Sequence, residues 1–235
     1  MKRKLKIGII GAGNIGSALV RHFTRLGHEV VVANSRGPQT LAELAKETGA
    51  KPVPVNEAAR GRDLVVVTIP ECKIPELPDG LFKEAQPNVI VIDTGNYYPR
   101  QRDGKIEEIE NGLAESRWVE KRLGHPVIKV FNNIYAEHLA KYGKPPGSPG
   151  RIALPVSGDE AEAKAVVMEL VNDIGFDAVD AGGLDESWRQ QPGTPVYPTD
   201  LDAAGVRRAL AQASPERKAE WRADAKSPRR EKQPA

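Results

Sequence analysis

The sequence contains little cysteine, histidine or aromatic side chain. Cys72 is the only cysteine among the 235 residues, which excludes a disulfide within the chain and a metal site built from several cysteines. The four histidines are scattered, so a metal site made of histidines is not expected either. Aromatic residues make up 5% of the chain, which argues against the broad stacking surfaces that bind nucleic-acid bases.

Long hydrophobic runs and an excess of one charge are also missing. No stretch approaches the roughly 18 apolar residues of a membrane span. The basic start of the chain is followed by only a short apolar run before Gly11, without a cleavage site. The formal net charge is +2, and the last 22 residues hold seven Lys or Arg against four Asp or Glu, so the basic excess lies in the tail. We therefore expect a cytoplasmic protein that binds neither membrane nor nucleic acid.

Apolar runs alternate with helical patterns along most of the chain. Continuous Val- and Ile-rich runs are typical of strands covered on both faces, and their alternation with helices is typical of a parallel α/β sheet. The predicted fold class is α/β, a Rossmann-type doubly wound, mostly parallel sheet with a smaller C-terminal lobe. Strands are expected at 5–10, 29–33, 51–55 (an edge strand or no strand, because it holds two prolines), 63–68, 89–93, 127–131, 152–157 and 177–180, and helices at 14–26, 40–48, 106–122, 159–174 and 199–213.

A connector rich in proline and glycine, residues 144–150, is the best candidate boundary. We expect a Rossmann domain over residues 1–143 and a C-terminal α/β lobe over 144–213 that completes the fold and the substrate cleft. Residues 214–235 are charged and poor in aliphatic side chains, so we expect a mobile tail there.

A glycine-rich turn with the sequence GAGNIG follows the first predicted strand and leads into a helix. In this context Gly11 permits the tight turn, Gly13 lets a pyrophosphate approach the backbone, and Gly16 lets helix and strand pack closely. Asn14 and Ile15 begin the helix, whose free N–H groups suit phosphate. We predict dinucleotide binding here. The alternative is a tight strand-to-helix turn without a ligand.

The end of the second predicted strand reads Asn34-Ser35-Arg36 and contains no acidic residue. NAD-selective folds usually carry Asp or Glu there to bind the ribose hydroxyls, and such a carboxylate would repel a 2′-phosphate. A serine hydroxyl and an arginine guanidinium would bind that phosphate through charge-assisted hydrogen bonds. We therefore predict that the cofactor is NADP(H). The alternative is a solvated turn arginine without a ligand.

The ends of the fourth, fifth and sixth predicted strands should cluster beside the nicotinamide, because ligands of open α/β sheets bind outside the carboxyl ends of the strands. The predicted cofactor-binding residues there are Thr68, Ile69, Pro70, Gly95, Asn96 and Asn132. Asn133 is a further neutral polar candidate. For each of these asparagines, satisfying the turn backbone is an equal alternative.

The sequence offers no convincing general acid–base pair, so no catalytic residue is assigned and no metal site is predicted. His138 is the only histidine near the expected cleft, and a lone histidine there is more often a helix-surface residue. Lys129 and Asn133 have the spacing of a dehydrogenase lysine–asparagine pair, but that pair needs one helix face and Lys129 falls in a predicted strand. Cys72 is expected to be a buried or unreactive cysteine and not a nucleophile.

Several segments together resemble the F420-dependent NADP reductase family, over roughly residues 5–190. The resemblance is carried by 7–16, 27–37, 129–133, 157–159, 174–176 and 180–182. It implies hydride transfer between NADP(H) and a planar deazaflavin, Ser35 and Arg36 as ligands of the 2′-phosphate, and a homodimer. Direct transfer between two rings needs position and electrostatics rather than an acid–base pair, which fits the absence of one.

Three functions stay open. The first is an oxidoreductase transferring a hydride between NADP(H) and a small planar acceptor such as coenzyme F420 or a flavin. The second is an NADPH-dependent imine or carbonyl reductase, which usually needs more than the about 85 residues that follow the predicted boundary. The third is a non-catalytic NADPH-binding or sensor protein. Residues 94–101 and 188–193 differ from deazaflavin-using members. Trp188, Arg189 and Tyr197 could close the cleft, or could instead pack within the lobe or a dimer.

Overall fold

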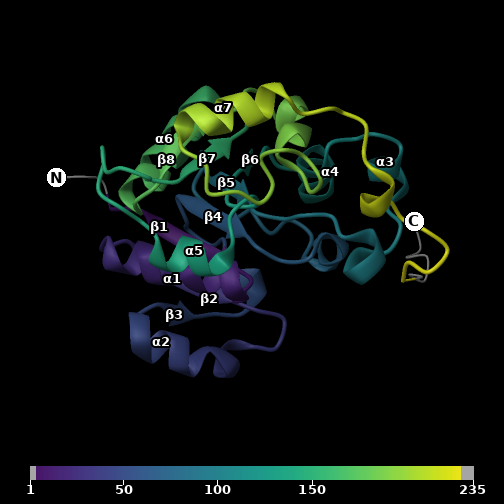
Figure 1. The fold of residues 1–235 in the computed structure, drawn as a ribbon. Coiled ribbons are helices and arrows are strands. Elements are labelled where there is room, and N and C mark those ends of the chain that lie inside the picture. Colours follow the sequence, from purple (N-terminus) through teal and green to yellow (C-terminus); the bar gives the residue numbers. More distant parts are fainter. Residues whose placement is uncertain (1–3, 229–235) are drawn as a thin grey trace.

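Six parallel strands form the main sheet in the order β3-β2-β1-β4-β5-β6 (Figure 1). The computed structural model describes residues 4–228. The strands are β1 (Lys6–Ile10), β2 (Glu29–Ala33), β3 (Lys51–Pro52), β4 (Leu64–Val67), β5 (Ile90–Asp93) and β6 (Ile128–Lys129). This is the doubly wound order, with its switch point between β1 and β4. The predicted fold class is confirmed.

Alternate residues of each central strand pack into different cores. In β4, Leu64 and Val66 join the core that includes Phe23, whereas Val65 and Val67 join the core on the other side of the sheet. Side chains alternate between the two faces of a strand, so a strand covered on both faces must be apolar throughout. This explains the continuous apolar runs of the sequence.

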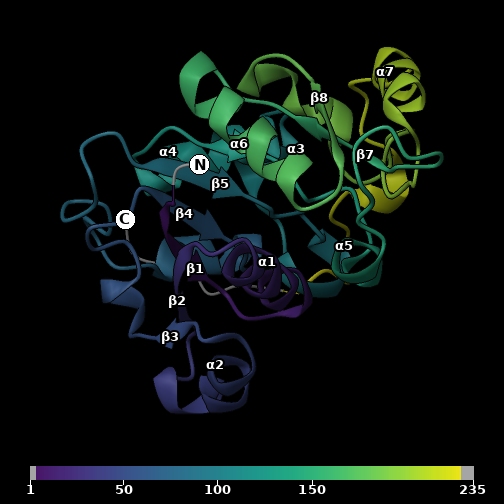
Figure 2. The same cartoon turned by 90° about the vertical axis from the view of Figure 1, so that its left-hand side faces the viewer.

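Helices cover both faces of the sheet. The first face packs against α1 (Asn14–Arg25), α5 (Ala136–Lys141) and α6 (Ala161–Asp173), and the second against α3 (Glu107–Glu110) and α4 (Glu115–Leu123). Figure 2 shows α2 (Ala42–Thr48) beyond β3 at one end of the sheet, with α6 and α7 (Ala203–Ala211) towards the other. None of the helices between residues 4 and 228 has the length and apolar character needed to cross a membrane.

The C-terminal part adds a second, two-stranded parallel sheet of β7 (Ala153–Val156) and β8 (Asp177–Asp180). An antiparallel bridge between Lys129 and Ser157 joins it to the edge of the main sheet. Leu154 of β7 also lies in the same core cluster as strand β1. The connector at 144–150 is mostly exposed, but the core continues across it.

Two predicted helices differ from the structure. The helix expected over 106–122 is divided into α3 and α4, with Gly112 between them at a φ of 102°, a conformation that glycine adopts without strain. The last helix begins at Ala203 rather than near Thr199. Asp202 is its N-cap, accepting a hydrogen bond from the Gly205 N–H at 2.7 Å, because a carboxylate satisfies a free N–H of the first turn.

Residues 214–228, predicted to be a mobile tail, instead lie along the body of the protein; we call them the strap. In Figure 1 the strap (yellow) runs from α7 past α3. The guanidinium of Arg217 pairs with Glu115, and that of Arg100 donates to the backbone carbonyl of Ala219 at 2.6 Å. Charges that look solvated in the sequence therefore have partners on the body in this structure, and the mobility of the segment stays a prediction. The rest of the predicted tail, 229–235, lies outside the described residues.

Candidate functional site

A cleft of about 530 Å³ lies at the carboxyl ends of strands β1, β4, β5 and β6. The strand-end turns that the sequence predicted to cluster meet here. The predicted cofactor-binding residues that line the cleft are Gly13, Asn14, Ile15, Thr68, Ile69, Pro70, Gly95, Asn96 and Asn132. Those outside its lining are Gly11, Gly16, Asn34, Ser35 and Arg36.

The three glycines of the first turn have different physical reasons to lack a side chain. A Cβ on Gly11 would lie 2.2 Å from the carbonyl oxygen of Thr68, and one on Gly16 would lie 2.0 Å from that of Gly11. The fold itself therefore requires these two glycines. Gly13 has an extended backbone, and a Cβ there would meet no atom within 4 Å. The open space at Gly13, at the start of α1, suits close approach of a phosphate group to the backbone.

Substituting these glycines should separate folding from binding. We expect Gly13→Ala to change the free energy of unfolding by less than about 0.5 kcal/mol and to weaken NADPH binding by about tenfold or more, since the new methyl group occupies the phosphate approach. Gly16→Ala is the comparison, and overpacking should destabilise it by about 1–3 kcal/mol. Urea denaturation and calorimetric titration would measure both. Unchanged NADPH affinity in Gly13→Ala would contradict a phosphate site there.

The loop after β2 presents one cation to solvent. The Asn34 Oδ1 accepts the Arg36 N–H at 3.0 Å, and the Asn34 Nδ2 donates to the hydroxyl of Thr40 at 2.9 Å, so this amide shapes the loop. Ser35 and Arg36 are exposed, and the guanidinium makes no ion pair within residues 4–228. The Gly11 N–H donates to the Ala33 carbonyl at 2.8 Å, which holds this loop beside the glycine turn.

Amide side chains tie the turns after β5 and β6 to each other. The Asn96 Nδ2 donates to the Asn132 carbonyl at 2.8 Å, and the Asn132 Nδ2 donates to the Gln190 carbonyl at 2.6 Å. The Gln190 Nε2 donates a hydrogen bond to the Asn132 Oδ1 at 3.0 Å, and the Gln190 Oε1 accepts one from the Ser157 hydroxyl. Asn96 and Asn132 thus each donate to a backbone carbonyl, and their side-chain oxygens accept from other side-chain amides. Gln190, a buried anchor from the C-terminal lobe, was missed because a loop glutamine carries no local signal.

Two residues beside these amides have unusual environments. Phe131 lines the cleft with a φ of 67°, the one positive φ of a non-glycine residue between residues 4 and 228. Such a conformation costs about 1–3 kcal/mol and persists only where packing holds it. Asn133 is buried, and its side-chain amide has no hydrogen-bond partner within the described residues; it does not line the cleft.

A buried ion pair holds the turn after β5 from behind. The ammonium of Lys129 lies 3.0 Å from the Asp93 Oδ2 and donates to the Gly95 carbonyl at 2.6 Å. The Asp93 Oδ1 accepts the Gly95 N–H at 2.8 Å, and its Oδ2 also accepts from the Ser116 hydroxyl. The two members of the pair thus hydrogen-bond to both the N–H and the carbonyl of Gly95. Lys129 lies on strand β6 as predicted, which excludes the helical lysine–asparagine pair.

Glu71 is buried behind the same turn, and its carboxyl has no hydrogen-bond partner within the described residues. A Cβ on Gly95 would lie 2.5 Å from the Glu71 Oε1, so the lack of a side chain at Gly95 makes room for this carboxyl. Burial and the neighbouring Asp93 carboxylate raise the pKa of Glu71 well above its usual range, against the opposing effect of Lys129. The protonated form of Glu71 is therefore favoured up to a higher pH than in the unfolded chain.

This proton predicts a pH-dependent gain for Glu71→Gln. Folding keeps a proton that the unfolded chain loses above the ordinary glutamate pKa of 4.5, so the wild type loses stability as pH rises. Glutamine carries no such proton. We expect the variant's stability relative to wild type to rise by about 1 kcal/mol per pH unit from pH 5 to 7, measured by urea denaturation. Glu76→Gln, at a half-exposed position on the same 3₁₀ segment, is the control for a Glu-to-Gln change outside the buried cluster. A flat profile for Glu71→Gln would contradict the protonated carboxyl.

The far wall of the cleft is aromatic. Phe131, Tyr98, Tyr135 and Tyr197 line it, and the hydroxyls of Tyr98 and Tyr197 share a hydrogen bond. The guanidinium of Arg102 lies 5.0 Å from the Tyr98 ring centroid, and it is the one charged group in the lining that the structure describes. This wall can receive a flat ring and place a cation beside it.

Other sequence candidates lie away from the cleft. Trp188 lines a different cavity, and Arg189 lies 4.4 Å above its ring, so of the three proposed cleft-closing residues only Tyr197 lines the cleft. His138 pairs with Asp200 and stacks on the ring of Tyr142, the C-cap of α5. The described residues contain no group of three or more His, Cys, Asp or Glu that could hold a metal ion.

Comparison with known proteins identifies a family for this chain. The family model described as "NADP oxidoreductase coenzyme F420-dependent" matches residues 6–97, from β1 to the turn after β5. The chain belongs to this F420-dependent NADP oxidoreductase family. The resemblance seen in the sequence is thereby confirmed, and the family's description names NADP as its nicotinamide cofactor.

Three relatives show how far the family likeness extends. The crystal structure of hypothetical protein SMa0349 from Sinorhizobium meliloti is 31% identical, with a TM-score of 0.70 over 83% of this chain and 94% of that one. A proposed F420-dependent NADP reductase from Arthrobacter sp. FB24 shares the fold at 23% identity, with a TM-score of 0.64 over 77% and 86% of the two chains. Protein YjhV of Escherichia coli K12 is 54% identical over 69 residues, 29% of this chain and 50% of its own. The chain spans about half the length of the curated relatives it matches.

Proposed function

We propose that this chain is an oxidoreductase that transfers a hydride between NADP(H) and a small planar acceptor, such as coenzyme F420 or a flavin. The observation that carries the proposal is the cleft itself. One end is the open glycine turn at Gly13, and the other is a wall that holds four aromatic side chains in a chain with 5% aromatic residues.

Different residues of the chain would bind the different parts of NADP(H). The backbone at Gly13 and the first N–H groups of α1 would bind the pyrophosphate, and Ser35 with Arg36 would bind the 2′-phosphate. The turns at 68–70 and 94–96 would frame the nicotinamide ring, with Gly95 fixed from behind by Lys129 and Asp93. Bound NADPH supplies two electrons and a hydrogen nucleus together as a hydride, and the acceptor takes its proton from solvent.

The aromatic wall would orient the acceptor ring against the nicotinamide. Flat side chains stack a conjugated ring, and Arg102, which lines the same cleft, is paired with the Asp103 carboxylate at 2.9 Å. Among the described residues, no carboxylate or histidine lines the cleft, which suits direct transfer between two rings, where orientation and electrostatics lower the barrier. The homodimer that the family resemblance implies stays a prediction, which light scattering on the purified protein would test.

The Tyr98–Tyr197 pair favours a second candidate, a carbonyl or imine reductase. A tyrosine hydroxyl in the cleft could donate a hydrogen bond to a carbonyl oxygen or an imine nitrogen as it gains charge. Burial and the hydrogen bond with Tyr98 raise the pKa of Tyr197 further above its usual range. Either hydroxyl of the pair can be the donor.

The test is NADPH oxidation by the purified protein against F420, FMN, riboflavin, a quinone and a small cyclic imine, with NADH as the control. We expect turnover with a planar acceptor and a strong preference for NADPH. Turnover with the imine alone would replace the first candidate by the second. Tight NADPH binding without turnover on any acceptor would overturn both and favour a sensor.

A further inference from the structure

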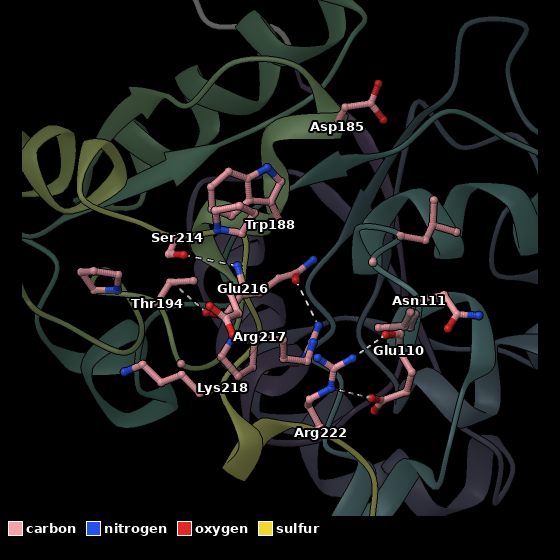
Figure 3. A pocket seen from close by; sticks show the side chains of 18 of the residues that line it. Glu110, Asn111, Asp185, Trp188, Thr194, Ser214, Glu216, Arg217, Lys218 and Arg222 are labelled. Atoms are coloured by element: carbon pink, nitrogen blue, oxygen red, sulfur yellow. Dashed lines mark hydrogen bonds and ion pairs between the residues drawn. The ribbon is translucent and has the colours of Figure 1, made fainter.

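The strap, residues 214–228, borders a cavity of about 810 Å³. Figure 3 shows this cavity with Arg217, Lys218 and Arg222 contributed by the strap, and with Arg222 beside Glu110. Because open space remains beneath it, the strap is not packed continuously on the body. It is held instead at separate points.

Those points lie on both sides of Trp221. Before it, the guanidinium of Arg217 pairs with the buried carboxylate of Glu115 at 2.6 Å and donates to the Gln191 Oε1 at 3.1 Å. After it, the Arg222 Nη2 donates to the Glu110 carbonyl at 3.0 Å. A paired, largely buried arginine is costly to detach, because its partner carboxylate would be left buried without a cation.

Arg100 completes the attachment from the body side. Its Nη2 donates to the Ala219 carbonyl at 2.6 Å and its Nε donates to the Arg222 carbonyl at 2.9 Å. The Ala223 N–H donates to the Glu110 Oε1 at 2.7 Å. These bonds fix the backbone on either side of Trp221 and so fix the position of its side chain.

Trp221 is the contact between the strap and the cleft. Its ring centroid lies 6.1 Å from those of Tyr98 and Tyr197, the two residues that share a hydrogen bond in the aromatic wall. Gly193 makes room for the indole: a Cβ there would lie 2.5 Å from the Trp221 Cδ1. Edge and tilted contacts at this distance restrain aromatic rings.

We propose that Trp221 is a positioning residue of the acceptor site, acting through Tyr98 and Tyr197. The inference rests on the proposed function for its kinetic consequence. The indole closes the outer side of the tyrosine pair, and without it both rings gain freedom and the wall for the acceptor loses its shape. The glycine turn and Arg36 belong to the opposite, N-terminal part of the site, so cofactor binding does not depend on Trp221.

The kinetic test compares Trp221→Ala with Trp221→Phe. We expect the alanine variant to raise KM for the planar acceptor about tenfold, with less than a twofold change in the Kd of NADPH measured calorimetrically. Phenylalanine should restore most of the KM. The matched control is Trp188→Ala, which removes an indole from the cavity beside the strap. Among the described ring contacts, those of Tyr98 and Tyr197 are with Trp221 and not with Trp188. Equal losses in NADPH affinity and acceptor KM would overturn the proposal.

A second measurement does not need turnover. In protein labelled with ¹³C-tyrosine, Trp221→Ala should shift the ring resonances of Tyr98 and Tyr197, assigned by single Tyr→Phe variants, and leave Tyr142 unchanged. If the wild type turns over no acceptor, the proposed function fails, and these resonances alone decide the role of Trp221. Unmoved Tyr98 and Tyr197 signals would overturn it.

Discussion

Replacing Lys129 with methionine is expected to lower the free energy of unfolding by about 3–5 kcal/mol. Lys129 is completely buried and lies 3.0 Å from the Asp93 carboxylate. Methionine fills much of the same space but leaves that carboxylate buried without a cation, next to the carboxyl of Glu71. It also removes the hydrogen bond to the Gly95 carbonyl. Urea denaturation at pH 7 would measure the loss as a lower midpoint at unchanged slope.

The controls for Lys129 use one exposed pair and one double variant. Lys141 and Glu137 form a pair whose side chains are both 65% exposed, so Lys141→Met should cost less than about 0.5 kcal/mol. Asp93→Asn in the Lys129→Met background removes the stranded charge and should recover part of the loss. A loss below about 1 kcal/mol in the single variant would contradict a buried, charged pair at this position.

Replacing Arg36 with alanine is expected to raise the Kd of NADPH about 10- to 100-fold while leaving that of NADH unchanged, because a charge-assisted hydrogen bond contributes about 1.5–3 kcal/mol. The 2′-phosphate is the only difference between the two cofactors, so the loss should appear with one alone. Arg36 is exposed and makes no ion pair within residues 4–228, so the fold should not change. Calorimetric titration with both cofactors would measure the two constants.

Arg60→Ala is the matched control for Arg36. Arg60 is also a surface arginine, 56% exposed, but it pairs with Glu84 away from the cleft, so its loss should leave both constants unchanged. Equal weakening of NADPH and NADH in Arg36→Ala would sink the assignment of NADP(H). If NADPH affinity and the unfolding midpoint both fall, the affinity is lost because the loop is distorted and not because a contact with the 2′-phosphate is removed.

Local features of the sequence were sufficient to predict the sheet. Strand alternation, the glycine turn at Gly11 and the edge position of 51–55 depend on residues close together in the chain. Helix ends were predicted less well. The break at Gly112 and the cap at Asp202 depend on one backbone conformation and one hydrogen bond, and periodicity reports neither. The meeting of the strand ends followed from topology, since parallel strands bring their carboxyl ends to one edge.

The side chains that finish the site could not be predicted, because their partners are far away in sequence. Asn132 and Gln190 are 58 residues apart, Tyr98 and Tyr197 are 99, and Glu115 and Arg217 are 102. Glu71 reads as a solvated glutamate until the fold surrounds it with Asp93 and Lys129.

The sequence by itself determined the class of fold and the family, and it predicted where a dinucleotide would bind, because hydrophobic period, glycine spacing and the missing acid after β2 are local properties. Only the tertiary structure decided which amides donate to backbone carbonyls, that the carboxyl of Glu71 is buried with a raised pKa, and that the charged C-terminal segment lies beside the aromatic wall. Those outcomes depend on burial and on contacts between distant segments, and neither exists until the chain has folded.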